Sequence, residues 1–308
     1  MELIAELRNR YKKGSTTFRL IFINTAVFLL VSILALIFFL FNIGDSEKFT
    51  ITNWVSLPAD MKLLLYRPWT LITYMFLHRD FMHILFNMLW LFWFGNIFLS
   101  YFTSRQMTSL YILGGLTGAA FYIGAYNLFP VFEPVVSASF LLGASASVYA
   151  IVIAISAYIP DYSIGLLFLG RIKLKYIALI VIIIDLASIP QGNAGGHISH
   201  LGGALFGFLF AVSIKRGKDI TKIFSDIMDA IFTLLKPSPK MKVHANKYKQ
   251  KQNPSASGKD TKSQSDQEYN RMKAQKQAVI DKILDKISKS GYESLTKEEK
   301  ETLFNAGK

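Results

Sequence analysis

Six blocks of apolar residues, each about twenty residues long, constrain the fold of this chain more than any other feature of its sequence. A helix of about twenty apolar residues crosses the hydrocarbon core of a bilayer. Because lipid offers no hydrogen-bond partners, a spanning segment must satisfy its own backbone, which favours helices. We therefore predict an all-α membrane protein, a bundle of six spans at residues 20–42, 82–102, 107–128, 137–158, 173–190 and 197–214.

The charge of the chain is +13, and the basic residues lie in the amino-terminal tail, in two short loops and after the last span. Beside membrane spans, such residues indicate an anionic cytoplasmic leaflet, and no base-reading module is visible, so we expect a lipid bilayer and no nucleic acid as partner. The positive-inside rule puts both termini in the cytoplasm, which six spans allow. No eukaryotic targeting segment is visible, so we expect a bacterial inner membrane.

The remaining sequence divides by composition. Residues 1–19 form a basic cytoplasmic tail, and residues 20–214 hold the six spans, with a long interfacial connection at 43–80. Residues 215–236 have apolar residues at helical spacing and predict an amphipathic helix on the inner leaflet. Residues 237–265 have the composition of a flexible linker, and residues 266–308 predict a small helical domain. In that domain Gly291 suits a helix end and Ser294 or Thr296 a new start.

Polar residues inside spans are costly, so each needs a reason. In the fourth span, Ser145 lies within Gly143-Ala144-Ser145-Ala146-Ser147, where small neighbours allow close approach. A serine hydroxyl is a weak nucleophile that needs an adjacent base, and serine in a span is by itself also a common packing residue. The chain has no cysteine, which excludes a thiol nucleophile and zinc–thiolate sites.

Histidines supply the candidate base and donors. His200 lies in the sixth span, followed by Gly203 and Gly207, which allow tight packing against a neighbouring helix. His83 and Asn87, four residues apart in the second span, share one helix face and can both donate hydrogen bonds to an oxyanion. The alternative is that these side chains have no catalytic role and make hydrogen bonds that hold the helices together. Tyr149, one turn after Ser145, can pack on an imidazole or be a simple core aromatic.

Three stretches resemble the rhomboid family of intramembrane serine proteases: RPWTLITYMFLHRDFMHILFNM, GASASVYA and SHLGGALFG. Together with the six-span order they cover about residues 43–214, and the tail from Lys215 lies outside the resemblance. It implies a six-span rhomboid-like bundle that acts as a serine-type endopeptidase on membrane-anchored proteins, in or near their transmembrane segments, without a cofactor or metal.

The resemblance also implies a role for each matching residue. Ser145 would be the nucleophile and His200 the base, and His83, Asn87 and the Ser145 amide would form the oxyanion hole. Tyr149 would stack on His200. Arg67, Gly143, Gly203 and Gly207 would be structural, with Arg67 holding the outer loop. The resemblance carries no carboxylate that orients the histidine, so the expected machinery is a dyad. Spans two and five would border the lateral entry of the substrate.

Some residues depart from this pattern or stay open. Ala146 replaces the second glycine of the family's GxSG, and we expect it to be tolerated. Ser147 lies about 200° round the helix from Ser145, so only one of the two can face His200. For Asp185 in span five we expect a structural hydrogen bond, and for His78 and His197 local hydrogen bonding.

Three other readings compete. A rhomboid-like protein without activity that binds client transmembrane helices would need neither Ser145 nor His200. A metal enzyme would use His78, His83, His197 and His200, although the sequence shows no HExxH and no carboxylate beside them. A transporter or channel would require internal repeats or charged spans. The sequence leaves the substrate, the oligomeric state and the role of the tail open.

Overall fold

The computed structural model describes residue 6 and residues 11–41, 51–166, 170–235, 279–288, 290–291 and 294–306. It separates into two units, Met1–Ser238 and Pro239–Lys308. The predicted linker at 237–265 lies outside the described residues, as do most of the first ten residues and residues 42–50.

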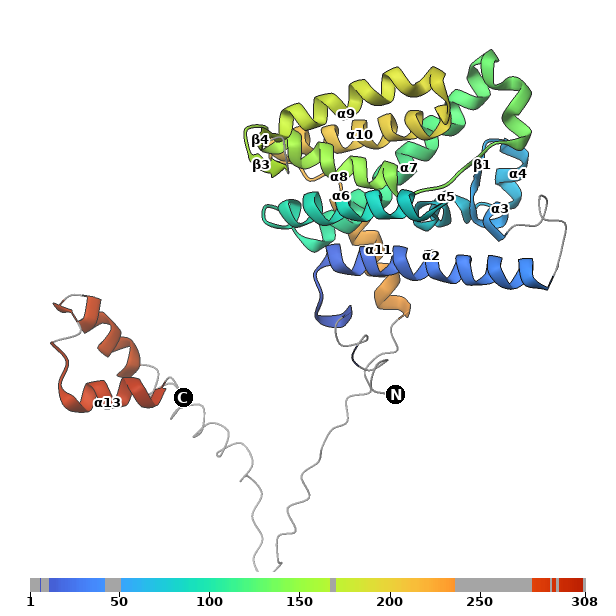
Figure 1. Ribbon diagram of the computed structural model, residues 1–308. Helices are drawn as coiled ribbons and strands as arrows, with labels where there is room; N and C mark the ends of the chain where they lie inside the picture. Colours follow the sequence, from blue (N-terminus) through green and yellow to red (C-terminus); the bar gives the residue numbers. More distant parts are fainter. Residues whose placement is uncertain are drawn as a thin grey trace, which may run out of the picture. The chain divides into compact units, whose positions relative to one another are not determined.

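Six helices form the bundle of the first unit (Figure 1). They are α2 (Thr16–Leu40), α6 (Phe81–Leu99), α7 (Ser104–Leu128), α8 (Ser145–Tyr158), α9 (Leu174–Ser188) and α10 (Ala194–Lys215). Among the described residues, five helices are long and apolar enough to cross a membrane: α2, α6, α7, α10, and α9 together with the turn η3 (Ile189–Gln191). The all-α bundle predicted from the apolar blocks is therefore confirmed.

The fourth predicted span is much shorter than expected. Residues 137–158 were predicted to be helical, but α8 begins at Ser145 and has 14 residues. Ahead of it lie the 3-10 segment η2 (Pro130–Ala138) and strand β2 (Phe140–Leu141), which pairs antiparallel with β1 (Leu57–Pro58). Gly143 then turns the chain with a φ of 135°, a backbone conformation that favours glycine. Apolar composition alone cannot distinguish this extended approach from a helix.

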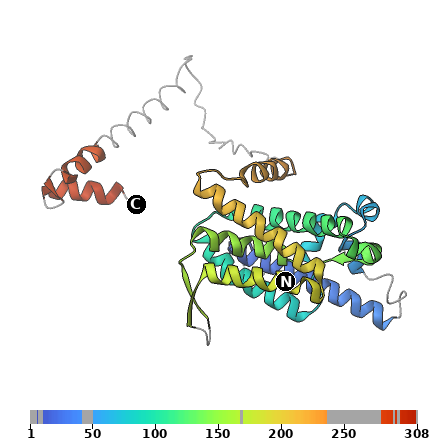
Figure 2. The same ribbon diagram turned by 90° about the horizontal axis from the view of Figure 1, so that it is seen from above.

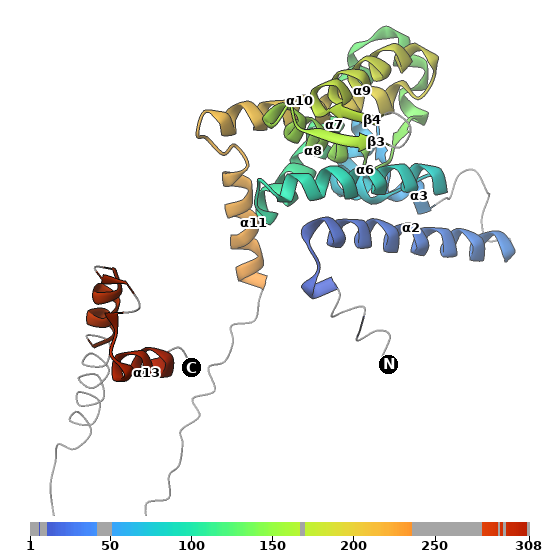
Figure 3. The ribbon, with the colours of Figure 1, turned by 60° about the vertical axis from the view of Figure 1, so that its left-hand side comes forward.

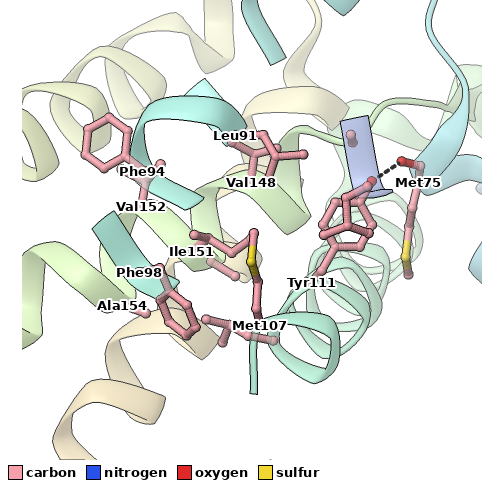
Figure 4. Packing of buried hydrophobic residues seen from close by; sticks show 14 of the residues in the cluster. Met75, Leu91, Phe94, Phe98, Met107, Tyr111, Val148, Ile151, Val152 and Ala154 are labelled. Carbon is pink, nitrogen blue, oxygen red and sulfur yellow. Dashed lines mark hydrogen bonds between the residues drawn. The ribbon is translucent and has the colours of Figure 1, made fainter. Parts of the chain in front are cut away.

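The short helix α8 is the centre of the bundle (Figure 2). On one side Leu91, Phe94 and Phe98 of α6 pack against apolar side chains of α8, with Met107 of α7 beneath them (Figure 4). On the other side, glycines let α7 and α10 approach its backbone. A Cβ atom at Gly203 would lie 2.1 Å from the Ala146 carbonyl oxygen. The stripe of Gly203 and Gly207 therefore packs tightly, as predicted.

The connection between α2 and α6 folds as short helices over one end of the bundle. These are α3 (Ile51–Val55), α4 (Met61–Tyr66), α5 (Thr70–Thr73) and the 3-10 turn η1 (Tyr74–Phe76). The Arg67 guanidinium donates to the Asn53 carbonyl at 3.1 Å and lies 4.1 Å from the centre of the Trp54 ring. Arg67 thus joins α4 to α3, in the place expected of a residue that holds this loop.

Two buried tyrosines tie that connection to the bundle. The Tyr74 hydroxyl donates to the Gly115 carbonyl of α7 at 2.6 Å, and the Tyr111 hydroxyl donates to the Met75 carbonyl at 2.9 Å (Figure 4). The Gly143 amide in turn donates to the Tyr74 carbonyl at 2.9 Å. Because these groups are buried, their hydrogen bonds fix η1 and the approach to Ser145 relative to α7.

The opposite end of the bundle carries the basic loops. The predicted loop between spans four and five is a hairpin of β3 (Ser163–Leu166) and β4 (Gly170–Lys173), and Asp161 pairs there with Lys173 and Lys175. Helix α11 (Lys222–Leu235) begins after a turn, and its axis runs at a steep angle to that of α6 (Figure 3). An Arg105–Asp229 ion pair of 2.9 Å joins it to the start of α7.

The second unit holds a helix at residues 279–288 and α13 (Lys297–Ala306). Gly291 has a φ of 75° at the end of the first helix, as predicted for a helix stop. Thr296 rather than Ser294 begins α13, because its hydroxyl and amide exchange hydrogen bonds with Glu299 in a capping box. Lys286 pairs with Glu299 at 2.9 Å and joins the two helices.

Candidate active site

A cavity of about 1040 Å³ opens among α2, α6, α8 and α10, at the end of the bundle that carries β1 and β2. Five residues predicted from the sequence line it together: Ser145, Tyr149, His200, His83 and Asn87. They come from three helices and are up to 117 positions apart, from His83 to His200. The fold therefore assembles the predicted polar residues in one place.

Ser145 is the first residue of α8, and no side chain caps that helix. The first amides of a helix lack intrahelical partners and carry the positive end of its dipole. The preceding Gly143 leaves room beside the hydroxyl: a Cβ atom there would lie 3.0 Å from His83 Nε2 and 3.4 Å from Ser145 Oγ. Free amides, a hydroxyl and an imidazole thus meet at one point of the cavity wall.

His200 is held face to face with an aromatic ring. The rings of Tyr149 and His200 are 4.4 Å apart with an interplanar angle of 19°. This stacking is the contact predicted from the position of Tyr149 one turn after Ser145. Within the described part of the chain, the Ser145 hydroxyl makes no hydrogen bond to His200. Catalytic hydrogen bonds are often long without substrate and shorten when it binds.

His83 can donate a proton into the cavity. Its Nδ1 accepts a weak hydrogen bond of 3.4 Å from the Arg79 amide, so a neutral ring carries its proton on Nε2, the atom beside Gly143. Asn87 uses one amide proton on the His83 carbonyl at 2.8 Å, and its second is available. Both side chains therefore offer the donors that the sequence suggested.

The two residues that follow Ser145 point away from the cavity. Ser147 is fully buried, and its hydroxyl faces α7, near enough that a Cβ atom at Gly115 would lie 2.7 Å from it. The methyl group of Ala146 faces Gly118 of α7, whose own Cβ atom would lie 2.5 Å from it. The methyl that replaces the family's glycine hydrogen is thus accommodated by the absence of a side chain at residue 118.

A carboxylate lies against the histidine, contrary to the expected dyad. Asp185 Oδ1 is 2.9 Å from His200 Nδ1 and 2.7 Å from His197 Nδ1, and the Asp185 side chain is 3% exposed. Asp185 and His197 thus have the hydrogen bonds predicted for them. One of the two partners of Asp185, however, is His200, the candidate base. The sequence could not reveal this, because the contact depends on how α9 and α10 are rotated against each other.

His78 differs from its prediction, since neither ring nitrogen makes a hydrogen bond of good geometry. It lies outside the spanning helices, is 5% exposed, and meets His83 edge-on with ring centres 5.1 Å apart. Burial, and then the neighbouring His83, lower the pKa of His78 to about 4. His78 is therefore neutral near pH 7 in the folded protein.

The metal-enzyme reading depended on a different set of ligands. Among the described residues, the group of side chains that could hold a metal ion is Asp185, His197 and His200, with ligand atoms within 4.8 Å of one another. The expectation that no carboxylate lies beside these histidines was wrong. His78 and His83 do not belong to this group.

A bundle of apolar helices that encloses a cavity lined in part by polar side chains defines a multi-pass integral membrane protein. A family model described as Rhomboid domain matches residues 66–217, and the chain belongs to the rhomboid family. A curated relative, RHOMBOID-like protein 12, mitochondrial, from Arabidopsis thaliana, is 29% identical over 158 residues, which cover 48% of this chain. The match spans about half of that relative, 47% of its length.

The carboxyl-terminal unit has a match of its own. A model described as a family of unknown function (DUF6576) matches residues 264–305. The relative's name refers to mitochondria, and the bacterial inner membrane stays a prediction for this chain.

Proposed function

We propose that this protein is an intramembrane serine endopeptidase that cleaves membrane-anchored proteins in or near their transmembrane segments. The observation that supports this most is the single cavity in which Ser145 at a helix start, the stacked His200 and the donors His83 and Asn87 meet. Membership in the rhomboid family, which the matched domain shows, supports the same activity.

In the proposed reaction, His200 Nε2 takes the proton of the Ser145 hydroxyl as Oγ attacks the carbonyl carbon of the scissile peptide. Hydrogen bonds from the Ser145 amide, His83 Nε2–H and the Asn87 side chain stabilise the negative charge that develops on the carbonyl oxygen. His200 then gives its proton to the leaving amine, and the peptide C–N bond breaks. A water molecule, deprotonated by His200, hydrolyses the acyl-enzyme and frees Ser145.

The orientation in the bilayer follows from the two ends of the bundle. Arg105, Lys173 and Lys175 lie at the end opposite the cavity, together with α11. We propose that this basic end faces the cytoplasm with both termini, and that the cavity opens to the other side. Substrate spans would enter between α6 and α9, whose outer faces expose large apolar residues such as Phe86 and Ile183.

Two observations favour one alternative, a rhomboid-like protein without activity that binds client transmembrane helices. The Ser145 hydroxyl makes no hydrogen bond to His200, and Ala146 stands in the place of a family glycine. A binding protein, however, has no need of His200 stacked in a cavity that also holds a free hydroxyl.

The test is labelling of the detergent-purified protein with a fluorophosphonate probe, together with cleavage of a model transmembrane substrate. We expect labelling and cleavage in the parent and in Ser147→Ala, and loss of both in Ser145→Ala and His200→Ala. A folded parent that neither labels nor cleaves would instead favour the inactive protein. Loss of cleavage on addition of a chelator would favour the metal enzyme.

A further inference from the structure

Asp185 is a buried carboxylate in a membrane-spanning helix, and its contacts are with two histidines of the next helix. Its residue exposure is 2%, and Oδ1 accepts from Nδ1 of both His197 and His200. We infer that Asp185 is a positioning residue that orients His200 as a base, so that Ser145, His200 and Asp185 act as a triad. This inference rests on the proposed function.

The burial of Asp185 is the first argument. An ionisable group in the hydrocarbon region is costly, and it persists there when it is paired and has a task. The described residues place no lysine or arginine against Asp185, and its second oxygen, Oδ2, has no hydrogen-bond partner. The contacts that offset the cost are with the two imidazoles and with the Tyr149 hydroxyl, which also interacts with this carboxylate. Holding those rings is what this side chain does in the fold.

The atoms that meet are the second argument. An ionised carboxylate only accepts hydrogen bonds, so His200 Nδ1 must carry a proton in this contact. A neutral imidazole then has its lone pair on Nε2, which is the form needed to take a proton from Ser145. Once Nε2 is protonated, the nearby negative charge stabilises the imidazolium, as in the serine protease triads of soluble enzymes.

Asp185 and Tyr149 restrain the His200 ring in different ways. Tyr149 stacks on its face at 4.4 Å, which leaves rotation within the ring plane open. The hydrogen bond of 2.9 Å to Asp185 acts at the edge of the ring and removes that freedom. His197, one turn earlier on α10, bonds the same oxygen at 2.7 Å and so keeps Oδ1 aimed at His200.

The experiment compares Asp185→Ala and Asp185→Asn with the parent, and uses Asp161→Asn as the matched control. Asp161 is a carboxylate that precedes α9 in the sequence, but it is exposed and pairs with Lys173 and Lys175 away from the cavity. Each protein is assayed for kcat and KM on a model transmembrane substrate, for fluorophosphonate labelling against pH, and for thermal unfolding.

We expect Asp185→Ala to lower kcat by about 10²-fold or more with KM little changed, because the ring loses its orientation. Asp185→Asn removes the charge, and its amide N–H can donate to His200 Nδ1 and favour the tautomer with the proton on Nε2, so it should lose at least as much rate. In the pH profile of labelling, the acid limb of Asp185→Asn should move to lower pH. The reason is that the His200 imidazolium forms only in more acid solution when no anion lies beside it. The other titratable groups near His200 are His83, Tyr149 and His197, and they are unchanged. Asp161→Asn should match the parent.

Each outcome decides the inference. A parent that labels and cleaves, with Asp185→Ala within twofold of its kcat, overturns the role of Asp185 and leaves the protease standing. If Asp185→Ala does not fold, Asp185→Asn decides: an unmoved acid limb overturns the inference and a shifted limb supports it. A folded parent that neither labels nor cleaves removes the proposed function, and the inference falls with it.

Discussion

Replacing Gly203 by alanine tests whether the contact between α8 and α10 sets the geometry of the site. The new Cβ atom would lie 2.1 Å from the Ala146 carbonyl oxygen and 2.8 Å from its carbon, where ordinary contact begins at 3.4 Å. The obstacle is backbone, which cannot rotate aside as a side chain can. The two helices must therefore separate locally by about 1.3 Å, the difference between 3.4 Å and 2.1 Å.

This separation affects both stability and rate. Overpacking of a close contact costs about 1–3 kcal/mol, partly offset by the helix preference of alanine over glycine, which is about 1 kcal/mol. Gly203 lies one turn after His200, so the shift also moves the base away from Ser145. A displacement of about 1 Å at a reacting group costs on the order of 10²-fold in rate. We expect cleavage to fall by about that factor while the protein still folds.

Two controls separate the contact from the substitution itself. A Cβ atom added at Gly124 on α7 would meet no other atom within 4 Å, so Gly124→Ala should retain activity and stability. A Cβ atom added at Gly207, two turns from His200, would lie 2.2 Å from the Ala150 carbonyl oxygen, so Gly207→Ala should destabilise similarly but slow cleavage less. Cleavage and thermal unfolding of Gly203→Ala equal to those of Gly124→Ala would show that this contact does not set the geometry of the site.

Three further predictions concern other parts of the chain. The pKa of His78 is lowered to about 4 in the folded protein, so the unfolded state binds the proton first as the pH falls. Between about pH 6.5 and pH 4, up to about 3 kcal/mol of stability should therefore be lost. Thermal unfolding of His78→Gln over the same pH range should lack this loss. The apolar face of α11 should lie on the inner leaflet. Because the chain has no cysteine, an environment-sensitive dye can be attached at Ile223→Cys or at Lys222→Cys in nanodiscs. Blue-shifted emission at residue 223 alone would support this placement, and equal spectra at the two positions would contradict it. Deletion of residues 237–308 should leave cleavage intact, because the residues of the cavity end at His200; a truncated protein that folds but does not cleave would show that the tail is needed.

The sequence was sufficient wherever composition and spacing carry the information. Apolar blocks located the bundle helices, and their small-residue stripes predicted the close packing of α10 through Gly203. The grouping of His83, Asn87, Ser145, Tyr149 and His200 came from the family resemblance, and the cavity has them together. Their catalytic roles stay predictions until activity is measured.

What the sequence missed depends on tertiary contacts. The extended approach to Ser145 has the composition of a span, and it departs from helix because it pairs with β1 and turns at Gly143. The Asp185–His200 contact joins two helices whose relative rotation no periodicity specifies. The hairpin of β3 and β4 is likewise stabilised by pairing, not by a strong local signal. A carboxylate in a span just before a histidine-bearing span was the available clue to the second case.

The shortness of α8 implies a limit on where a substrate can be cut. Fourteen helical residues measure about 21 Å, against about 30 Å of hydrocarbon. If Tyr158 lies at the inner boundary, the Ser145 hydroxyl is recessed by about 9 Å from the outer one. An extended chain covers that depth in about three residues. The enzyme would then measure its cleavage site from the membrane surface, and a peptide bond would qualify by its depth and its ability to leave the helix as well as by its side chains.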